Sequence, residues 1–170
     1  MKEFYFIRHG QTDYNIRADH DKIEHPPHIP LNATGRAQAL AIAPVISTLP
    51  IKTICCSPYL RAQETKKLIA EKLAVDAIDM EDLGECNAQI WIEMFTNQKS
   101  DLSLSFEQRV KKGLDAALEK EGPVLIVAHG GVHWAICSLL NIANHHYAVD
   151  NCIPIHFSQV EGEWKARVLV

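Results

Sequence analysis

Short apolar runs alternate with stretches of helical periodicity along this 170-residue chain, and this alternation restricts the fold more than any other feature. The runs are rich in aromatic, β-branched and small residues, a pattern typical of strands buried on both faces. Six segments are predicted as strands on this basis, at residues 4–7, 53–56, 75–78, 124–127, 153–157 and 164–170. The sequence therefore predicts a sheet with a buried centre.

The intervals between these strands carry apolar residues at helical spacing. Helices are predicted in four of them, at residues 32–48, 58–73, 105–118 and 132–140. Asn32 is a favourable N-cap, and Pro44 is expected to kink or shorten the first helix. Ser57 followed by Pro58 predicts the start of the second helix, and the Ser105–Gln108 capping box that of the third. Strands alternating with helices predict an α/β fold, a three-layer α/β/α sandwich around a mostly parallel central sheet.

Composition restricts the classes of partner. Apolar residues make up 47% and charged residues 22%, which suits one globular domain over residues 1–170. With 17 basic and 21 acidic residues there is no basic stripe, so no nucleic-acid partner is expected. Histidines and glycines interrupt the longest apolar region, residues 124–140, so no membrane span is expected. Five cysteines without CxxC spacing predict a cytoplasmic protein. The sequence indicates no cofactor and no protein partner.

Residues able to bind or attack a ligand directly follow three of the predicted strands. Arg8, His9 and Gly10 follow the first, Ser57 to Arg61 follow the second, and His129 with Gly130 follows the strand at 124–127. Ligands of open α/β sheets bind outside the carboxyl ends of the strands. Two arginines and two histidines gathered there form a cationic site, and the guanidinium fork matches phosphate oxygens.

A phosphoryl group bound there has a nucleophile beside it. A neutral histidine can attack phosphorus and form a covalent phosphoenzyme that water later hydrolyses. Neighbouring guanidinium groups disfavour the imidazolium and hold such a histidine neutral. Helix N-termini expected after Thr12, Ser57 and Gly131 would add backbone N–H donors for the phosphate.

Four ordered motifs resemble the histidine phosphatase (phosphoglycerate mutase-like) superfamily. They are Phe6-Ile7-Arg8-His9-Gly10-Gln11-Thr12 with Asn15, then Pro30-Leu31-Asn32 through Gly35-Arg36-Ala37-Gln38-Ala39, then Ser57-Pro58 with Arg61-Ala62 and Glu64-Thr65, and finally Val127-Ala128-His129-Gly130-Gly131-Val132. The resemblance implies that His9 is the phosphorylated nucleophile and that Arg8, Arg61 and His129 hold the phosphoryl group. It also implies a phosphate-binding role for Gly10, Thr12, Asn15 and Gly130.

The resemblance further implies an acidic proton donor to the leaving oxygen. The family segment Glu-x-x-Phe-Gly-x-Trp is matched at Glu85 and Trp91 but not at Ala88 and Gln89. An alkoxide leaving group needs a proton, and a carboxyl of raised pKa can supply it. Glu85 is therefore the expected acid, and three neighbouring carboxyls remain as alternatives, Glu81, Asp82 and Glu93.

The predicted activity is metal-independent hydrolysis of a small phosphomonoester, with a small cap formed by loops at about 17–30 and 79–104. The alternatives are phosphoglycerate mutase-type transfer, which usually needs extra segments around the site, a protein phosphohistidine phosphatase, and a non-catalytic binding module. A metal hydrolase is suggested by His145-His146 and by the His129/His133 pair, but it does not explain the two arginines. The loop with His25 and His28 carries no diagnostic pattern, so the sequence does not define the substrate.

Overall fold

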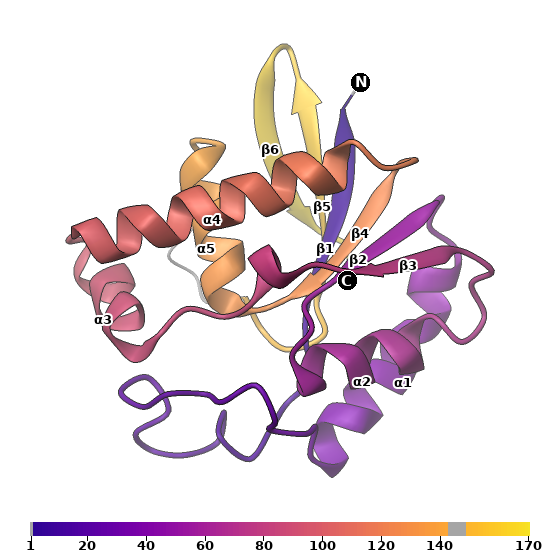
Figure 1. The fold of residues 1–170 in the computed structure, drawn as a ribbon. Coiled ribbons are helices and arrows are strands. Elements are labelled where there is room, and N and C mark those ends of the chain that lie inside the picture. Colours follow the sequence, from indigo (N-terminus) through magenta and orange to yellow (C-terminus); the bar gives the residue numbers. More distant parts are fainter. Residues whose placement is uncertain (1, 143–148) are drawn as a thin grey trace.

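Four neighbouring strands of a six-stranded sheet run parallel to one another in this computed structural model, which describes residues 2–142 and 149–170. The sheet has the strand order β3-β2-β4-β1-β5-β6. β5 pairs antiparallel with β1, and β6 pairs antiparallel with β5 (Figure 1). The strands are β1 (Glu3–Arg8), β2 (Thr53–Cys56), β3 (Asp76–Asp79), β4 (Val124–Ala128), β5 (Pro154–Val160) and β6 (Glu163–Val168).

The central strands are buried on both faces, as their continuous apolar runs predict. All residues of β2 and β4 are buried, and so are the four middle residues of β1. Arg8 pairs with Ala128, and Cys56 pairs with Val127. This register aligns the carboxyl ends of β1, β2 and β4 at one edge of the sheet.

Helices cover both faces, which confirms the three-layer sandwich around a mostly parallel sheet. Inward side chains of α1 and α2 pack with Ile7, Ile54 and Val127 on one face, and those of α3, α4 and α5 pack with Phe6 and Ile126 on the other. The helices are α1 (Ala33–Ser47), α2 (Leu60–Ile69), α3 (Ala88–Thr96), α4 (Asp101–Leu118) and α5 (Gly130–Leu139), with a 3₁₀ turn η1 (Glu81–Leu83).

Two predicted helix starts are wrong. α2 begins at Leu60 rather than after Ser57, whose hydroxyl instead accepts the Tyr59 N–H at 3.2 Å. α4 begins at Asp101, four residues before the predicted start at Ser105, because Ser100 and Ser103 form the reciprocal capping box. The capping pair predicted at Ser105 lies inside this helix.

Three other local predictions also differ from the structure. Pro44 does not shorten α1, which continues to Ser47, since a proline in the last turn removes only one backbone bond. No helix follows Thr12, where the chain forms turns. The irregular segment 79–104 contains α3, which begins at the N-cap Asn87.

No helix within residues 2–142 and 149–170 is long and apolar enough to cross a membrane. The five cysteines are all buried and unpaired. His145 and His146, considered above as metal ligands, lie outside the described residues.

Candidate active site

The three aligned strand ends bring the predicted residues together. The His9 N–H donates to the Ala128 carbonyl at 3.0 Å, and the Ser57 N–H donates to the Val127 carbonyl at 2.9 Å. Arg8 is the last residue of β1. These backbone bonds tie the segments after β1 and β2 to β4, so the residues that follow all three strands are neighbours.

His9 is 1% exposed and has a defined tautomer. Its Nδ1 lies 2.7 Å from the Gly10 carbonyl, which can only accept, so Nδ1 carries the proton. Nε2 therefore holds the lone pair and accepts the Arg61 Nε–H at 3.2 Å. Burial, and then the charges of Arg61 and Arg8, hold the pKa of His9 well below 6.5. The imidazole is neutral at pH 7, as a nucleophile requires.

Gly10 is needed because the loop after β1 touches α1. A Cβ on Gly10 would lie 2.5 Å from the Gly35 carbonyl oxygen, and the surrounding atoms are backbone that cannot move aside. The Gly10 N–H donates to Thr65 Oγ1 at 2.9 Å, and that hydroxyl donates to the Arg61 carbonyl at 2.7 Å. The nucleophile's loop is thus bonded to α2, the helix that carries Arg61.

Thr12 and Asn15 form a closed turn beside this loop. The Thr12 N–H donates to Asn15 Oδ1 at 2.9 Å, and the Asn15 N–H donates to Thr12 Oγ1 at 3.3 Å. The Asn15 Nδ2 amide is buried and has no hydrogen-bond partner among the described residues.

Arg61, 1% exposed, is held at three of its five N–H donors. Besides the bond to His9, Nη1 donates to the Pro26 carbonyl at 2.8 Å and Nη2 donates to the His25 carbonyl at 3.3 Å. The guanidinium carbon lies 5.1 Å from the centre of the Tyr59 ring. Two N–H groups on the terminal nitrogens remain for an anion.

Arg8 reaches the same place from the end of β1. Its Nη1 donates to the Val149 carbonyl at 2.8 Å, while its Nε is buried without a hydrogen-bond partner among the described residues. Burial lowers the pKa of Arg8, and the nearby carboxylates of Glu85 and Asp150 raise it. The ordinary pKa of a guanidinium lies so far above 7 that Arg8 keeps its charge.

His129 completes the set at the end of β4. Its ring centre lies 5.2 Å from that of His9 and 5.0 Å from that of Tyr59. The Ser57 hydroxyl accepts the Tyr59 N–H at 3.2 Å and forms a hydrogen bond of 2.7 Å with His129 Nε2, in which the tautomer of His129 sets the donor. Nδ1 of His129 is buried and has no hydrogen-bond partner among the described residues. Burial, followed by the charge of Arg61, holds the pKa of His129 well below 6.5.

Glu85 is 8% exposed and lies between η1 and α3. Its Oε1 accepts N–H bonds from Cys86 at 2.9 Å and from Gly131, in the first turn of α5, at 3.1 Å. Burial raises the pKa of Glu85 above 4.5, against the lowering effect of Arg61 and Arg8. Among the carboxyls considered from sequence, this one is enclosed beside both arginines.

The three alternative acids have other surroundings. The Glu93 carboxylate accepts from Ser100 Oγ at 2.7 Å, and hydrogen bonds led by that of Ser103 lower its pKa to about 2. Asp82 pairs with Lys112 at 3.3 Å. Glu81 is exposed at the start of η1.

Gly130 and Trp91 meet at the edge of the site. A Cβ on Gly130 would lie 2.7 Å from the tip of the Trp91 ring and 3.6 Å from the guanidinium carbon of Arg8. The structure therefore places the matched end of the Glu85–Trp91 segment next to Arg8.

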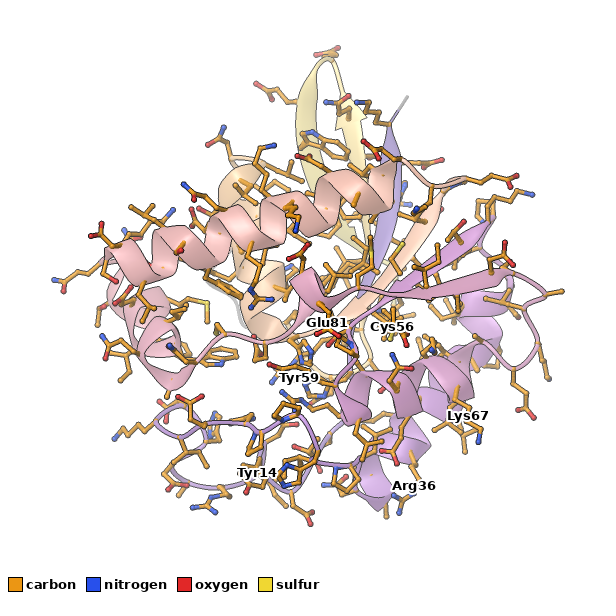
Figure 2. The ribbon with its side chains drawn as sticks, in the orientation of Figure 1. Tyr14, Arg36, Cys56, Tyr59, Lys67 and Glu81 are labelled. Carbon is orange, nitrogen blue, oxygen red and sulfur yellow. The ribbon has the colours of Figure 1, made fainter. Side chains whose placement is uncertain are left out.

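The loop of residues 17–30 contacts the site through its backbone. His25 and Pro26 supply the two carbonyls that bind Arg61, whereas His28 is exposed. Glu24 Oε1 accepts the Ala88 N–H at 3.0 Å, which joins this loop to the start of α3. In Figure 2, Tyr59 lies at the start of α2, between Glu81 and the loop that carries Tyr14.

The His129/His133 pair does not form a shared site. His129 Nε2 contacts Ser57, whereas His133 Nε2 lies 3.5 Å from Cys137 Sγ and its ring packs against Phe6. Across residues 2–142 and 149–170, no group of three or more histidine, cysteine or acidic side chains could hold a metal ion.

Four contributors to the site were not predicted. Ser57 orients His129, Tyr59 packs against two of the site residues, Asn151 Nδ2 donates to the His9 carbonyl at 2.8 Å, and Arg109 binds the backbone before Glu85. Ser57 belongs to the Ser57-Pro58 motif described above, but no role in the site was predicted for it. The others act through distant contacts that no local pattern signals.

Comparison with known families agrees with this geometry. Residues 4–104 match the model of the histidine phosphatase superfamily (branch 1). The chain belongs to this superfamily.

Individual relatives share the fold over nearly the whole chain. The α-ribazole phosphatase of Shigella flexneri has a TM-score of 0.75 at 22% identity, covering 99% of this chain and 96% of its own. A mycobacterial glucosyl-3-phosphoglycerate phosphatase has a TM-score of 0.77 at 21% identity, covering 99% and 98%. In sequence, agropine synthesis reductase of Rhizobium rhizogenes is 32% identical over 99% of this chain but only 42% of its own length. This chain thus spans about two fifths of the curated relatives that match it first.

Proposed function

We propose that this protein is a metal-independent phosphomonoesterase that works through a phosphohistidine at His9. The observation that carries the proposal is a set of three buried side-chain nitrogens, on the segments after β1 and β4, that have no hydrogen-bond partner among residues 2–142 and 149–170: Arg8 Nε, Asn15 Nδ2 and His129 Nδ1. Buried polar groups are nearly always hydrogen-bonded. Arg8 Nε, Asn15 Nδ2 and the free N–H groups of Arg61 suit the oxygens of a phosphoryl group, and His129 Nδ1 adds a further donor in the tautomer that carries its proton there.

The first step transfers the phosphoryl group to the protein. The substrate phosphate takes the Arg61 Nε–H that now bonds His9, and this frees the Nε2 lone pair. Nε2 forms the N–P bond as the bond between phosphorus and the leaving oxygen breaks, and protonated Glu85 gives its proton to that oxygen. The Gly10 carbonyl holds the Nδ1 proton of the resulting phosphoimidazolium.

The second step returns the enzyme to its starting state. Water attacks phosphorus, the Glu85 carboxylate accepts the water proton, and the N–P bond breaks. Inorganic phosphate leaves and His9 regains its lone pair. The buried position of Glu85 next to both arginines, set against the other engagements of Glu81, Asp82 and Glu93, supports Glu85 as the proton donor.

We propose further that residues 17–30 and 79–104 form the small cap of a single domain. The Glu24–Ala88 bond that joins the two segments supports this assignment. With so small a cap, water can reach the phosphohistidine, which favours hydrolysis over mutase transfer.

The proposal is tested with the purified chain on p-nitrophenyl phosphate and a panel of small phosphates, with and without a strong chelator. We expect phosphate release that survives chelation and an acid-labile radiolabel that His9→Ala abolishes. His156→Ala is the matched control, because His156 pairs with Glu3 at 2.6 Å outside the site. Turnover by His9→Ala, or phosphoglycerate isomerisation faster than phosphate release, would refute the proposal.

A further inference from the structure

We propose that Arg109 is a positioning residue for the proton donor Glu85, an inference that rests on the proposed function. Arg109 lies on α4, and its guanidinium donates to four backbone carbonyls between Glu81 and Glu85. Nη1 reaches Glu81 at 3.3 Å and Asp82 at 3.0 Å, and Nη2 reaches Gly84 at 2.9 Å and Glu85 at 3.3 Å.

The segment has little regular structure of its own to fix it. It consists of the single 3₁₀ turn η1 and the extended residue Gly84, and it pairs with no strand. Two further contacts seat it on α4. The Leu83 side chain is fully buried, and Gly113 allows the close approach, since a Cβ there would lie 3.0 Å from Asp82 Cβ. These contacts hold η1, whereas the carbonyls nearest the acid are bound by Arg109.

Arg109 is itself oriented by its own helix. Its guanidinium carbon lies 4.9 Å from the centre of the Phe106 ring, one turn earlier on α4. A planar fork packed on a ring can hold several carbonyls in one fixed geometry, which a flexible ammonium cannot.

Glu85 is consequently held from two sides. Arg109 binds its main-chain carbonyl from α4, while Gly131 donates to its carboxyl from the start of α5. A general acid must lie within hydrogen-bond reach of the leaving oxygen, and a misplacement of about 1 Å can cost about 100-fold in rate. Loss of Arg109 should therefore impair proton donation without touching the residues that bind phosphate.

The test compares Arg109→Ala, Arg109→Lys and Lys112→Ala on two substrates, an alkyl phosphate and p-nitrophenyl phosphate. The alkyl leaving group needs the proton from Glu85, and p-nitrophenolate needs it much less. Arg109→Ala should lower kcat on the alkyl phosphate about 10- to 100-fold and on p-nitrophenyl phosphate less than about threefold. Arg109→Lys keeps the charge but loses the fork, and should restore only part of the loss. Lys112→Ala removes a cation of the same helix that reaches only the Asp82 side chain, and should leave both rates unchanged.

A double variant separates positioning from general destabilisation. If Arg109 acts through Glu85, then Arg109→Ala should change the ratio of the two rates by less than about twofold when Glu85→Gln is already present. Equal losses on both substrates, or the same effect of Arg109→Ala in the Glu85→Gln background, would overturn the inference while leaving the proposed function intact. A wild-type protein that releases no phosphate would overturn the proposed function, and the inference with it.

Discussion

Gly131, in the first turn of α5, offers a test of the acid's environment that does not remove the acid. A Cβ at this position would lie inside 3.0 Å of Glu85 Oε1 and 2.6 Å from Cys86 Sγ, closer than real Cβ atoms come. Both neighbours are themselves buried. Gly131→Ala should therefore push the Glu85 carboxyl away by roughly half an ångström or more, and lengthen its 3.1 Å bond from the Gly131 N–H.

The expected change in the free energy of unfolding combines one stabilising effect and two destabilising ones. Alanine stabilises a helix by about 1 kcal/mol relative to glycine. Overpacking a buried site costs about 1–3 kcal/mol, and weakening one buried hydrogen bond costs about 0.5–1.5 kcal/mol. We expect the free energy of unfolding to fall by about 1–2 kcal/mol, together with a loss of about tenfold or more in kcat on an alkyl phosphate.

Urea unfolding measures the first quantity, and steady-state kinetics on the alkyl phosphate measures the second. In a Glu85→Ala background the carboxyl no longer obstructs the new methyl group, so the stability cost of Gly131→Ala should fall by at least about half. A Gly131→Ala variant that is more stable than wild type and equally active would refute the reasoning.

Two further predictions concern pH. Burial raises the pKa of Glu85 above 4.5, and Glu85 loses its proton as pH rises through that pKa, so kcat on an alkyl phosphate should fall there. Glu85→Gln should lack this alkaline limb of the pH–rate profile. An identical profile in both proteins would exclude Glu85 as the acid. His9 and His129 titrate well below 6.5 when folded but near 6.5 when unfolded, so the unfolded chain alone takes up these protons as pH falls below 6.5. The free energy of unfolding should then decrease by about 1.4 kcal/mol per pH unit for each histidine. Urea titrations at pH 7.5, 6.5 and 5.5 measure this slope, which should be smaller in His9→Asn. An unchanged slope would contradict the conclusion that His9 is buried and neutral.

The sequence alone determined the sheet and the polar residues at its edge. Burial on both faces demands continuous apolar runs, and those of β1, β2 and β4 are visible without any structure. Parallel strands end at the same edge of a sheet, so Arg8, His9 and His129 were expected at that edge. The pairing of β1 with β4, which makes them neighbours, comes from the structure.

Helix ends were predicted less well, because a capping motif is common and tertiary contacts choose among the candidates. Serine is a favoured N-cap residue, yet the Ser57 hydroxyl is hydrogen-bonded to His129 and the helix begins three residues later, at Leu60. Ser105 and Gln108 fit a capping box, but Ser100 and Ser103 form the one that is used.

The tertiary structure distinguishes Glu85, the acid expected from the sequence, from three chemically similar neighbours. Glu81 and Asp82 are more exposed than Glu85, whereas Glu93 is equally buried and differs in the hydrogen bonds from Ser103 and Ser100 that lower its pKa. The N–H of Gly131 and the fork of Arg109 reach Glu85 from two different helices. A pKa and a position set by such distant contacts depend on the folded geometry, and no local pattern of residues encodes them.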